Sequence, residues 1–295
     1  MFRNRAVAVA VAVGLSAAAA FAQSAPESGY APVNGLKMYY EIRGSGQPLV
    51  LLHGGVGAIE MFAPILPALS ASHRVIAVDL QAHGRTADID RPLRVELMAD
   101  DVAAVIRHLG MARADVLGYS LGGAVALQTA IRHPRLVRKL VVVSTPFRRD
   151  GWYPEILTGM AQMGPQAAEP MKQTPMYALY ARVAPRPQDW PVLLAKIGEA
   201  LMQDYDWSRE VAALQMPVLI VAGDADAVRT AHLVEFFALL GGGQRDAGWD
   251  GSGRPRAQLA ILPGATHYDI FSRPELASTA LQFLDAPLPA AVGSK

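Results

Sequence analysis

Apolar and polar residues along this chain fall into two kinds of block. Short continuous apolar runs indicate strands buried on both faces, and longer stretches with helical spacing separate them. The order of these blocks predicts an α/β protein with a mostly parallel, doubly wound sheet and helices on both faces. Asn34-Gly35 interrupts two shorter strand-like runs and predicts a tight hairpin turn. The apolar runs are residues 48–53, 74–79, 114–117, 139–144, 216–223 and 258–262, and the helical stretches are 95–109, 123–130 and 230–240.

The alternation stops between residues 147 and 210. This stretch contains seven prolines, three of the four tryptophans and five of the eleven methionines, so it is interrupted often but is too apolar for a linker. It predicts short helices that form a lid over the C-terminal edge of the sheet. A glycine-rich loop at 241–256 fits either a mobile surface loop or the rim of a site. The predicted organisation is a core of residues 23–146 and 211–286, a lid at 147–210 and a disordered tail at 287–295.

The first 22 residues differ from the rest of the chain. Arg3 and Arg5 precede an apolar run over residues 6–20, and Ala20-Phe21-Ala22 has the form of a cleavage site. These features are typical of a secretory signal peptide, so the mature protein is expected to begin at Gln23 and to be periplasmic or secreted. A lasting membrane anchor is disfavoured because the run is shorter than the roughly 20 residues needed to cross a bilayer. N-terminal sequencing of exported protein distinguishes the two alternatives.

Composition argues against several classes of function. Without Arg3 and Arg5 the formal net charge changes from +1 to −1, so no basic excess points to nucleic acid or to an anionic membrane. The chain has no cysteine, which excludes a thiol nucleophile, a cysteine-based metal site and a disulfide scaffold. The histidines lack the spacing of a metal motif, and residues 54–57 lack the ending of a phosphate loop. Neither a metal nor another cofactor is therefore expected.

Ser120 is the strongest candidate for a chemical role. It lies in Gly118-Tyr119-Ser120-Leu121-Gly122, between the strand predicted at 114–117 and the helix predicted at 123–130. A serine on such a strand-to-helix turn has a strained backbone, and its hydroxyl projects out of the turn. Glycine is needed two positions before and two positions after because the turn leaves no room for a side chain there. We therefore predict that Ser120 is a nucleophile rather than an ordinary turn serine.

A nucleophilic serine needs a histidine base, and the base needs an acid that orients it. Two later strands end in such residues: the run 216–223 leads into Asp224-Ala225-Asp226, and the run 258–262 leads to His267. Parallel sheets place their sites at the carboxyl ends of the strands, so these side chains are expected beside Ser120. The order serine, acid, histidine is also the one expected for a nucleophile on this kind of turn. The spacing alone leaves Asp224 and Asp226 as alternatives.

These motifs resemble those of the serine α/β-hydrolase superfamily, over about residues 30–285. The resemblance implies the α/β-hydrolase fold with a helical cap inserted after the sixth strand. One segment departs from the usual Gly-His-Gly-x-Ser pattern, with Ala82 and Thr86 at two of its positions, which concerns only the shape of that loop. The matching segments are Leu52-His53-Gly54-Gly55, Asp79-Leu80-Gln81-Ala82-His83-Gly84-Arg85-Thr86, Gly118-Tyr119-Ser120-Leu121-Gly122-Gly123, Gly223-Asp224-Ala225-Asp226 and Pro263-Gly264-Ala265-Thr266-His267.

The resemblance also implies roles for the candidate residues. In the family pattern Gly-x-x-Asp the second carboxylate belongs to the triad, which favours Asp226 and leaves Asp224 to cap the following turn. Some relatives carry the acid after the strand at 139–144, where Asp150 would be the candidate. The implied triad is therefore Ser120, Asp226 and His267.

The oxyanion hole is expected to consist of two backbone amides. One is the amide of Leu121, the residue after the nucleophile, and the other belongs to the loop after the strand at 48–53. By resemblance the second donor is Gly55, with Val56 as the alternative.

The predicted reaction is hydrolysis of a carboxylic ester or lactone through an acyl-enzyme on Ser120. A serine nucleophile argues against the dehalogenases and epoxide hydrolases of this fold, which use a carboxylate. Carbon–carbon bond hydrolases, perhydrolases or haloperoxidases, and aminopeptidases remain alternatives, as does a catalytically silent binding module. Val56, Tyr119 and Leu121 differ from the proline iminopeptidase pattern. The apolar lid predicts a small hydrophobic substrate whose acyl or ring portion is uncharged.

Overall fold

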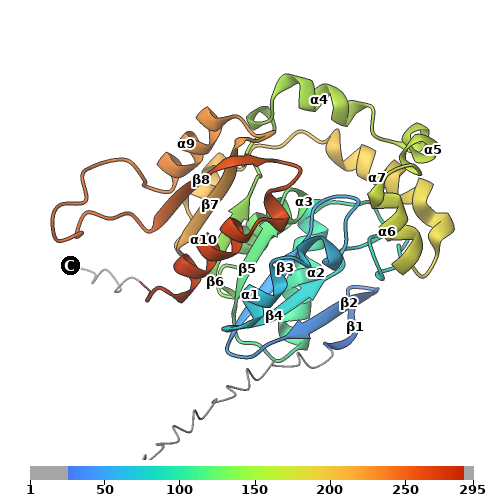
Figure 1. Ribbon diagram of the computed structural model, residues 1–295, viewed down its shortest axis with the longest axis horizontal. Coiled ribbons are helices and arrows are strands. Elements are labelled where there is room, and N and C mark those ends of the chain that lie inside the picture. Colours follow the sequence, from blue (N-terminus) through green and yellow to red (C-terminus); the bar gives the residue numbers. More distant parts are fainter. Residues whose placement is uncertain (1–25, 289–295) are drawn as a thin grey trace, which may run out of the picture.

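A computed structural model describes residues 26–288 of the protein. The signal peptide predicted at 1–22 and most of the tail predicted at 287–295 lie outside these residues. Within this range eight strands form one sheet in the order β1-β2-β4-β3-β5-β6-β7-β8 (Figure 1). The strands are β1 (Glu27–Val33), β2 (Leu36–Arg43), β3 (Gln47–Leu52), β4 (His73–Val78), β5 (Ala114–Tyr119), β6 (Val137–Val143), β7 (Val218–Ala225) and β8 (Ala257–Thr266).

The sheet is mostly parallel, as the sequence predicts. Strands β3 to β8 run parallel to one another, whereas β2 pairs in the antiparallel sense with both of its neighbours, β1 and β4. The predicted hairpin turn lies between β1 and β2, where Asn34 and Gly35 both have positive φ, of 47° and 85°. Two consecutive positive φ values match the twist of a two-residue hairpin loop, which is why Asn-Gly is favoured there.

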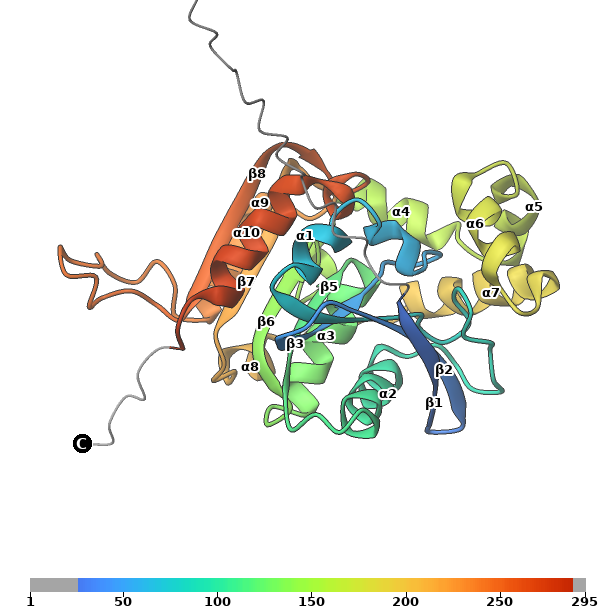
Figure 2. The same ribbon diagram turned by 60° about the horizontal axis from the view of Figure 1, so that its bottom comes forward.

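Helices cover both faces of the sheet. Helices α1 and α10 lie on one side, and α2 and α3 lie on the other (Figure 2). In the central strand β3, Leu49 and Leu51 pack toward α1 and α10, whereas Val50 and Leu52 pack on the opposite side. Because both faces are buried, every position must be apolar, which explains the continuous apolar runs in the sequence. The helices are α1 (Leu66–Ser70), α2 (Val95–His108), α3 (Leu121–Arg132), α4 (Pro154–Ala161), α5 (Ala168–Met171), α6 (Pro175–Val183), α7 (Trp190–Leu201), α8 (Ser208–Ala212), α9 (Thr230–Leu239) and α10 (Pro274–Asp285).

Five short helices, α4 to α8, occupy the chain between β6 and β7. The prolines that interrupt this stretch begin helices: Pro154, Pro175 and Pro191 lie in the first turns of α4, α6 and α7. Proline fits there because the first amides of a helix have no acceptor within it. Trp190 is buried among the lid helices, where its Nε1 donates to the carbonyl of Ala168 at 3.1 Å. The buried side chains of α5 to α7 belong to the same hydrophobic cluster as α2, α3 and one face of the sheet, and these helices lie together at one end of the molecule (Figure 1).

Two strands extend further than the sequence predicts. Strand β7 reaches Ala225 and β8 reaches Thr266, because pairing resumes at Ala225 with Thr266 after an irregularity at Gly223. A Cβ on Gly223 would lie 2.1 Å from the carbonyl oxygen of Ala265, so the strands approach here only because residue 223 is glycine. As a result Asp226 and His267 each come directly after the last residue of a strand.

The glycine-rich loop at 241–256 lies between α9 and β8, at the edge of the sheet away from the lid helices (Figure 1). None of its residues lines the pocket beside Ser120, so the rim interpretation of this loop is wrong. Within residues 26–288 no helix is both long enough and apolar enough to cross a membrane.

Candidate active site

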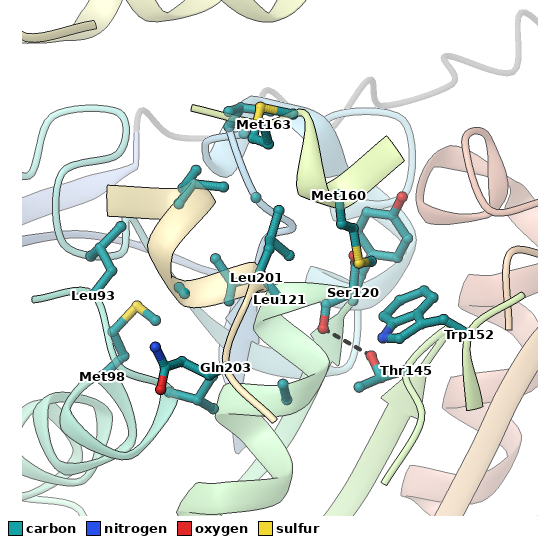
Figure 3. Close-up of a pocket in the computed structure, with 18 of the residues that line it drawn as sticks. Leu93, Met98, Ser120, Leu121, Thr145, Trp152, Met160, Met163, Leu201 and Gln203 are labelled. Atoms are coloured by element: carbon teal, nitrogen blue, oxygen red, sulfur yellow. Dashed lines mark hydrogen bonds between the residues drawn. The ribbon is translucent and has the colours of Figure 1, made fainter. Parts of the chain in front are cut away.

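Ser120 lies on a strained turn between β5 and α3. Its φ of 53° and ψ of −119° are unusual for a residue with a side chain, as expected for a functional turn. Two hydrogen bonds hold this conformation, one from the Ser120 amide to the Val143 carbonyl at 3.0 Å and one from the Thr145 hydroxyl to the Ser120 carbonyl at 2.9 Å (Figure 3). The strained turn at Ser120, called the elbow below, is therefore held by residues at the end of β6 and just after it, as well as by its own sequence.

The flanking glycines are required by close packing, as predicted. A Cβ on Gly118 would lie 2.0 Å from the carbonyl oxygen of Gly122, and a Cβ on Gly122 would lie 2.3 Å from that of Leu52. A Cβ on Gly123 would lie 2.0 Å from the hydroxyl oxygen of Thr145. Any side chain at these positions would push α3 away from the sheet and displace Ser120.

The structure brings Ser120, His267 and Asp226 together. His267 Nε2 lies 3.2 Å from Ser120 Oγ, and His267 Nδ1 lies 3.0 Å from Asp226 Oδ1. With Nδ1–H donating to the carboxylate, Nε2 is free to accept the Ser120 proton, which is the tautomer a general base needs. Each of the three residues follows the end of a different parallel strand, so the sheet itself produces the constellation.

Asp226 is buried and accepts four hydrogen bonds. Besides His267, the amide of Val228 donates to Oδ1 at 3.1 Å, the amide of Gly223 to Oδ2 at 3.1 Å, and the Ser144 hydroxyl to Oδ2 at 2.5 Å. Burial by itself raises the pKa of this carboxyl, but the hydrogen bonds and the neighbouring histidine together hold the pKa below its usual range. Asp226 therefore stays ionised and can stabilise a positive His267.

The other two candidate acids lie elsewhere. Asp224 is exposed, and its Oδ1 accepts the amide of Gly264 at 2.9 Å, so it links the end of β7 to the end of β8 instead of capping the turn that follows it. Asp226 makes the turn contacts that were expected of Asp224. Asp150 is exposed and bonds to Arg148 at 2.7 Å, so it has no contact with the base.

Candidate oxyanion donors line the same pocket. Leu121 is the first residue of α3, so its amide has no acceptor within the helix. Gly55 and Val56 also line the pocket, in a turn closed by the Gly57 amide and the Gly54 carbonyl at 3.2 Å, and a Cβ on Gly55 would lie 3.9 Å from the Cβ of Leu121. Val56 has a positive φ of 53°, a strained value for a β-branched residue. The geometry is compatible with either Gly55 or Val56 as the second donor.

His53 ties the oxyanion loop to the loop after β4. Its Nδ1 lies 2.7 Å from the Gly54 carbonyl, and its Nε2 accepts the Leu80 amide at 3.1 Å. An acceptor nitrogen carries no proton, so the ring must be neutral, and burial lowers the pKa of His53 to about 4. Burial likewise lowers the pKa of His83, whose ring lies 5.1 Å from that of His53, to about 3.

These histidines predict loss of stability in acid. The unfolded chain binds protons on both histidines below about pH 6.5 and the folded chain does not, so the free energy of unfolding falls as the pH falls. At pH 4 each histidine lowers the free energy of unfolding by about 3 kcal/mol. Burial raises the pKa of Asp79 to about 6, so the folded chain binds a proton there first, and this gain offsets about as much as one histidine loses. The urea midpoint is therefore expected to be lower at pH 4.5 than at pH 7.5. His83→Asn, which retains a donor for the Gln81 carbonyl, should reduce that difference, and an unchanged difference would contradict the assignment.

Sequence analysis missed three residues that support the triad. Ser144 donates to Asp226 from the end of β6, where it too has a positive φ of 53°. Thr145 holds the Ser120 carbonyl, and the Tyr119 hydroxyl donates to the carbonyl of His267 at 2.5 Å. Tyr119 lies next to Ser120 inside the recognised motif, so its position could have indicated a supporting role. Nothing local distinguished Ser144 or Thr145, since their contacts cross strands.

The site opens into a cavity of about 570 Å³ between the sheet edge and the lid. Figure 3 shows Trp152 and Met160 beside Ser120, with Leu93 and Met98 at the other end of the cavity. The T-shaped contact between Trp152 and His267, with ring centroids 5.5 Å apart, holds the indole against the base. Within residues 26–288 no cluster of three His, Asp or Glu side chains could hold a metal ion.

Comparisons with known proteins identify the family of the chain. Residues 47–182 match the family model for the alpha/beta hydrolase fold. The chain is also 33% identical over 205 residues, 63% of this chain and 77% of the relative, to the pimeloyl-[acyl-carrier protein] methyl ester esterase of Neisseria meningitidis serogroup B. The chain belongs to the α/β-hydrolase family. This α/β-hydrolase therefore has the fold and the relatives that its motifs predict.

Other matches show how widely the chemistry of similar proteins varies. The α/β-hydrolase is 26% identical over 265 residues, 83% of this chain and 90% of the relative, to the 2-(acetamidomethylene)succinate hydrolase of Mesorhizobium japonicum. The carboxylesterase CesB of Bacillus subtilis has the same fold, with a TM-score of 0.66, 22% identity, and coverage of 88% of this chain and 92% of that one. These relatives are named as hydrolases or esterases, and the compounds for which they are named differ.

Proposed function

We propose that this α/β-hydrolase is a serine hydrolase that cleaves a carboxylic ester or lactone through an acyl-enzyme on Ser120. The observation that carries the proposal is the continuous series of contacts from Ser120 Oγ through His267 to the buried Asp226 at the floor of an apolar cavity. A buried, ionised acid behind a neutral imidazole is the arrangement that activates a serine hydroxyl.

The reaction follows from these positions in two steps. Ser120 Oγ attacks the carbonyl carbon while His267 Nε2 takes its proton, and the resulting oxyanion accepts hydrogen bonds from the Leu121 amide and from Gly55 or Val56. His267 then gives the proton to the departing alcohol oxygen, leaving the acyl group on Ser120. A water molecule, deprotonated by His267, then attacks the acyl-enzyme, and His267 returns this proton to Ser120 Oγ as the bond to the acyl group breaks and the acid is released.

The substrate is proposed to carry an apolar acyl or ring portion. Among the apolar residues of the lid, Trp152, Met160, Met163 and Met176 line the cavity, whereas Tyr180 and Trp190 pack against each other with ring centroids 5.2 Å apart. Flexible methionines and a flat indole suit an irregular hydrophobic ligand. A cavity of about 570 Å³ is in the range of small-molecule sites, so an acyl group of several carbons fits.

A panel of p-nitrophenyl esters of increasing acyl length, run beside lactones and aminoacyl arylamides, tests the proposal. Esters or lactones should be hydrolysed and a fluorophosphonate probe should label Ser120. Met160→Ala should change the ratio of kcat/KM between long and short esters by at least about threefold, because it removes apolar wall from the cavity.

Leu157→Ala is the matched control for that variant. Leu157 lies on the same helix α4 and packs toward the core without lining the cavity, so its loss should lower Tm and leave the chain-length ratio unchanged. Faster turnover of aminoacyl arylamides than of any ester would argue for a peptidase. Absence of both labelling and turnover would argue for a silent binding module.

A further inference from the structure

The cavity contains an arginine, Arg149, whose position is fixed by its backbone. It begins a 3-10 turn at Arg149–Gly151, just after β6. Its amide donates to the Tyr205 carbonyl at 3.1 Å, beside an antiparallel bridge between Arg148 and Asp206. The side chain lines the same cavity as Ser120. The turn after β6 and the chain after α7 therefore hold a guanidinium at this wall.

The charge of Arg149 has no partner among residues 26–288. No carboxylate oxygen of these residues lies within 4.0 Å of its guanidinium, whereas the adjacent Arg148 pairs with both Asp150 and Glu235. Arg149 Nε is buried without a hydrogen-bond acceptor, and the carbonyl of Leu201 lies 3.5 Å from Nη2, at the limit for a hydrogen bond. A half-buried guanidinium without an anion is costly, and a bound anion would offset that cost.

Tyr205 supplies a second donor at the same wall. Its hydroxyl accepts the Trp152 Nε1–H at 3.2 Å, which leaves its own proton available, since the structure shows no acceptor for it among the described residues. Burial raises the pKa of Tyr205 well above its usual range, and the nearby Arg149 guanidinium opposes this rise. The hydroxyl therefore remains protonated at neutral pH. Both residues line the cavity, and the hydrogen bond between the Arg149 amide and the Tyr205 carbonyl places their backbones side by side.

Trp152 relates this wall to the catalytic base. One part of its ring system packs against His267, with centroids 5.5 Å apart, and its Nε1 reaches the Tyr205 hydroxyl. The Tyr205 hydroxyl is thus separated from the catalytic base by the indole of Trp152. A group held there would belong to the body of the substrate and not to the bond that is cleaved.

We infer that Arg149 and Tyr205 form a subsite that holds a carboxylate on the substrate, remote from the scissile ester or lactone. The inference rests on the proposed function and changes the expected substrate class: in place of a wholly uncharged acyl or ring portion, it proposes an apolar body that ends in a distant carboxylate. A planar carboxylate can accept from the two terminal nitrogens of a guanidinium and from a hydroxyl together. Two acidic side chains also line the cavity. Glu96 is half-buried and Asp204 is exposed, so water screens their repulsion of a carboxylate on the ligand.

Two esters with the same chain of six acyl carbons test this directly: p-nitrophenyl hexanoate, which is neutral, and the mono-p-nitrophenyl ester of adipic acid, which ends in a carboxylate. Arg149→Met should lower kcat/KM for the adipate ester by about tenfold to hundredfold, because a charge-assisted contact is lost, and for the hexanoate by less than about threefold. Arg149→Lys, which keeps the charge, should retain part of the preference. Tyr205→Phe should lower the adipate value selectively by about threefold.

Arg94→Met is the matched control, since Arg94 also lines the cavity but is exposed. It should leave the ratio of the two esters unchanged. The carboxylate subsite is overturned if the ratio of kcat/KM between the two esters stays unchanged in both Arg149→Met and Arg149→Lys, whether or not both values fall. Hexanoate turnover would in that case still support the proposed function. If the wild-type protein hydrolyses neither ester and is not labelled by fluorophosphonate, both proposals fail.

Discussion

Ser120→Ala is expected to lower kcat for the best ester substrate by about a millionfold, and His267→Ala by a similar factor, because the two residues act as one unit. Without the hydroxyl there is no acyl-enzyme, and without the imidazole the hydroxyl 3.2 Å away is not deprotonated. Steady-state kinetics on a p-nitrophenyl ester and labelling with fluorophosphonate measure the loss. The double variant should be little worse than either single variant.

Neither substitution should unfold the protein. The Ser120 side chain makes a single hydrogen bond, to His267, and the backbone contacts that fix the turn do not involve it. Tm should therefore change by only a few degrees, and alanine tolerates the turn about as well as serine. A folded Ser120→Ala protein that keeps more than about one hundredth of the wild-type kcat would rule out Ser120 as the nucleophile.

Asp226→Asn is expected to lower kcat by about 10⁴-fold. An amide cannot carry the charge that stabilises a protonated His267, and its NH₂ group would face either Nδ1 or the donors from Ser144 and Gly223. The imidazole would then favour the tautomer with its proton on Nε2, which cannot accept from Ser120. Kinetics on the folded variant, with near-ultraviolet circular dichroism to verify its packing, measure the effect.

Asp224→Asn is the matched control because it makes the same chemical change two residues away. Its amide oxygen can still accept the Gly264 amide, so we expect less than about a threefold change in kcat. If Asp224→Asn proved the more damaging of the two folded variants, the acid would be Asp224 and the contact between His267 and Asp226 would not describe the working enzyme.

Much of the fold could be predicted because its signals are local. Strands such as β3 are buried on both faces, so their apolar runs are continuous and easy to recognise, and Asn34-Gly35 indicates its own turn. The ends of β7 and β8 were predicted too early because they depend on a contact that is not local. Their pairing resumes at Ala225 with Thr266 only because Gly223 permits a close approach, which depends on the neighbouring strand.

The sequence by itself determined the α/β class, the elbow at Ser120 and the position of His267 after a strand, because each depends on short-range periodicity or on glycines that a tight turn requires. Only the tertiary structure decided which groups surround Asp226, which lid residues face the cavity and that Arg149 lacks a partner in the described chain. Those features depend on contacts between segments far apart in sequence. Side-chain type and spacing do not encode which distant surface a residue will face, since that direction is set by how the lid helices pack on the finished sheet.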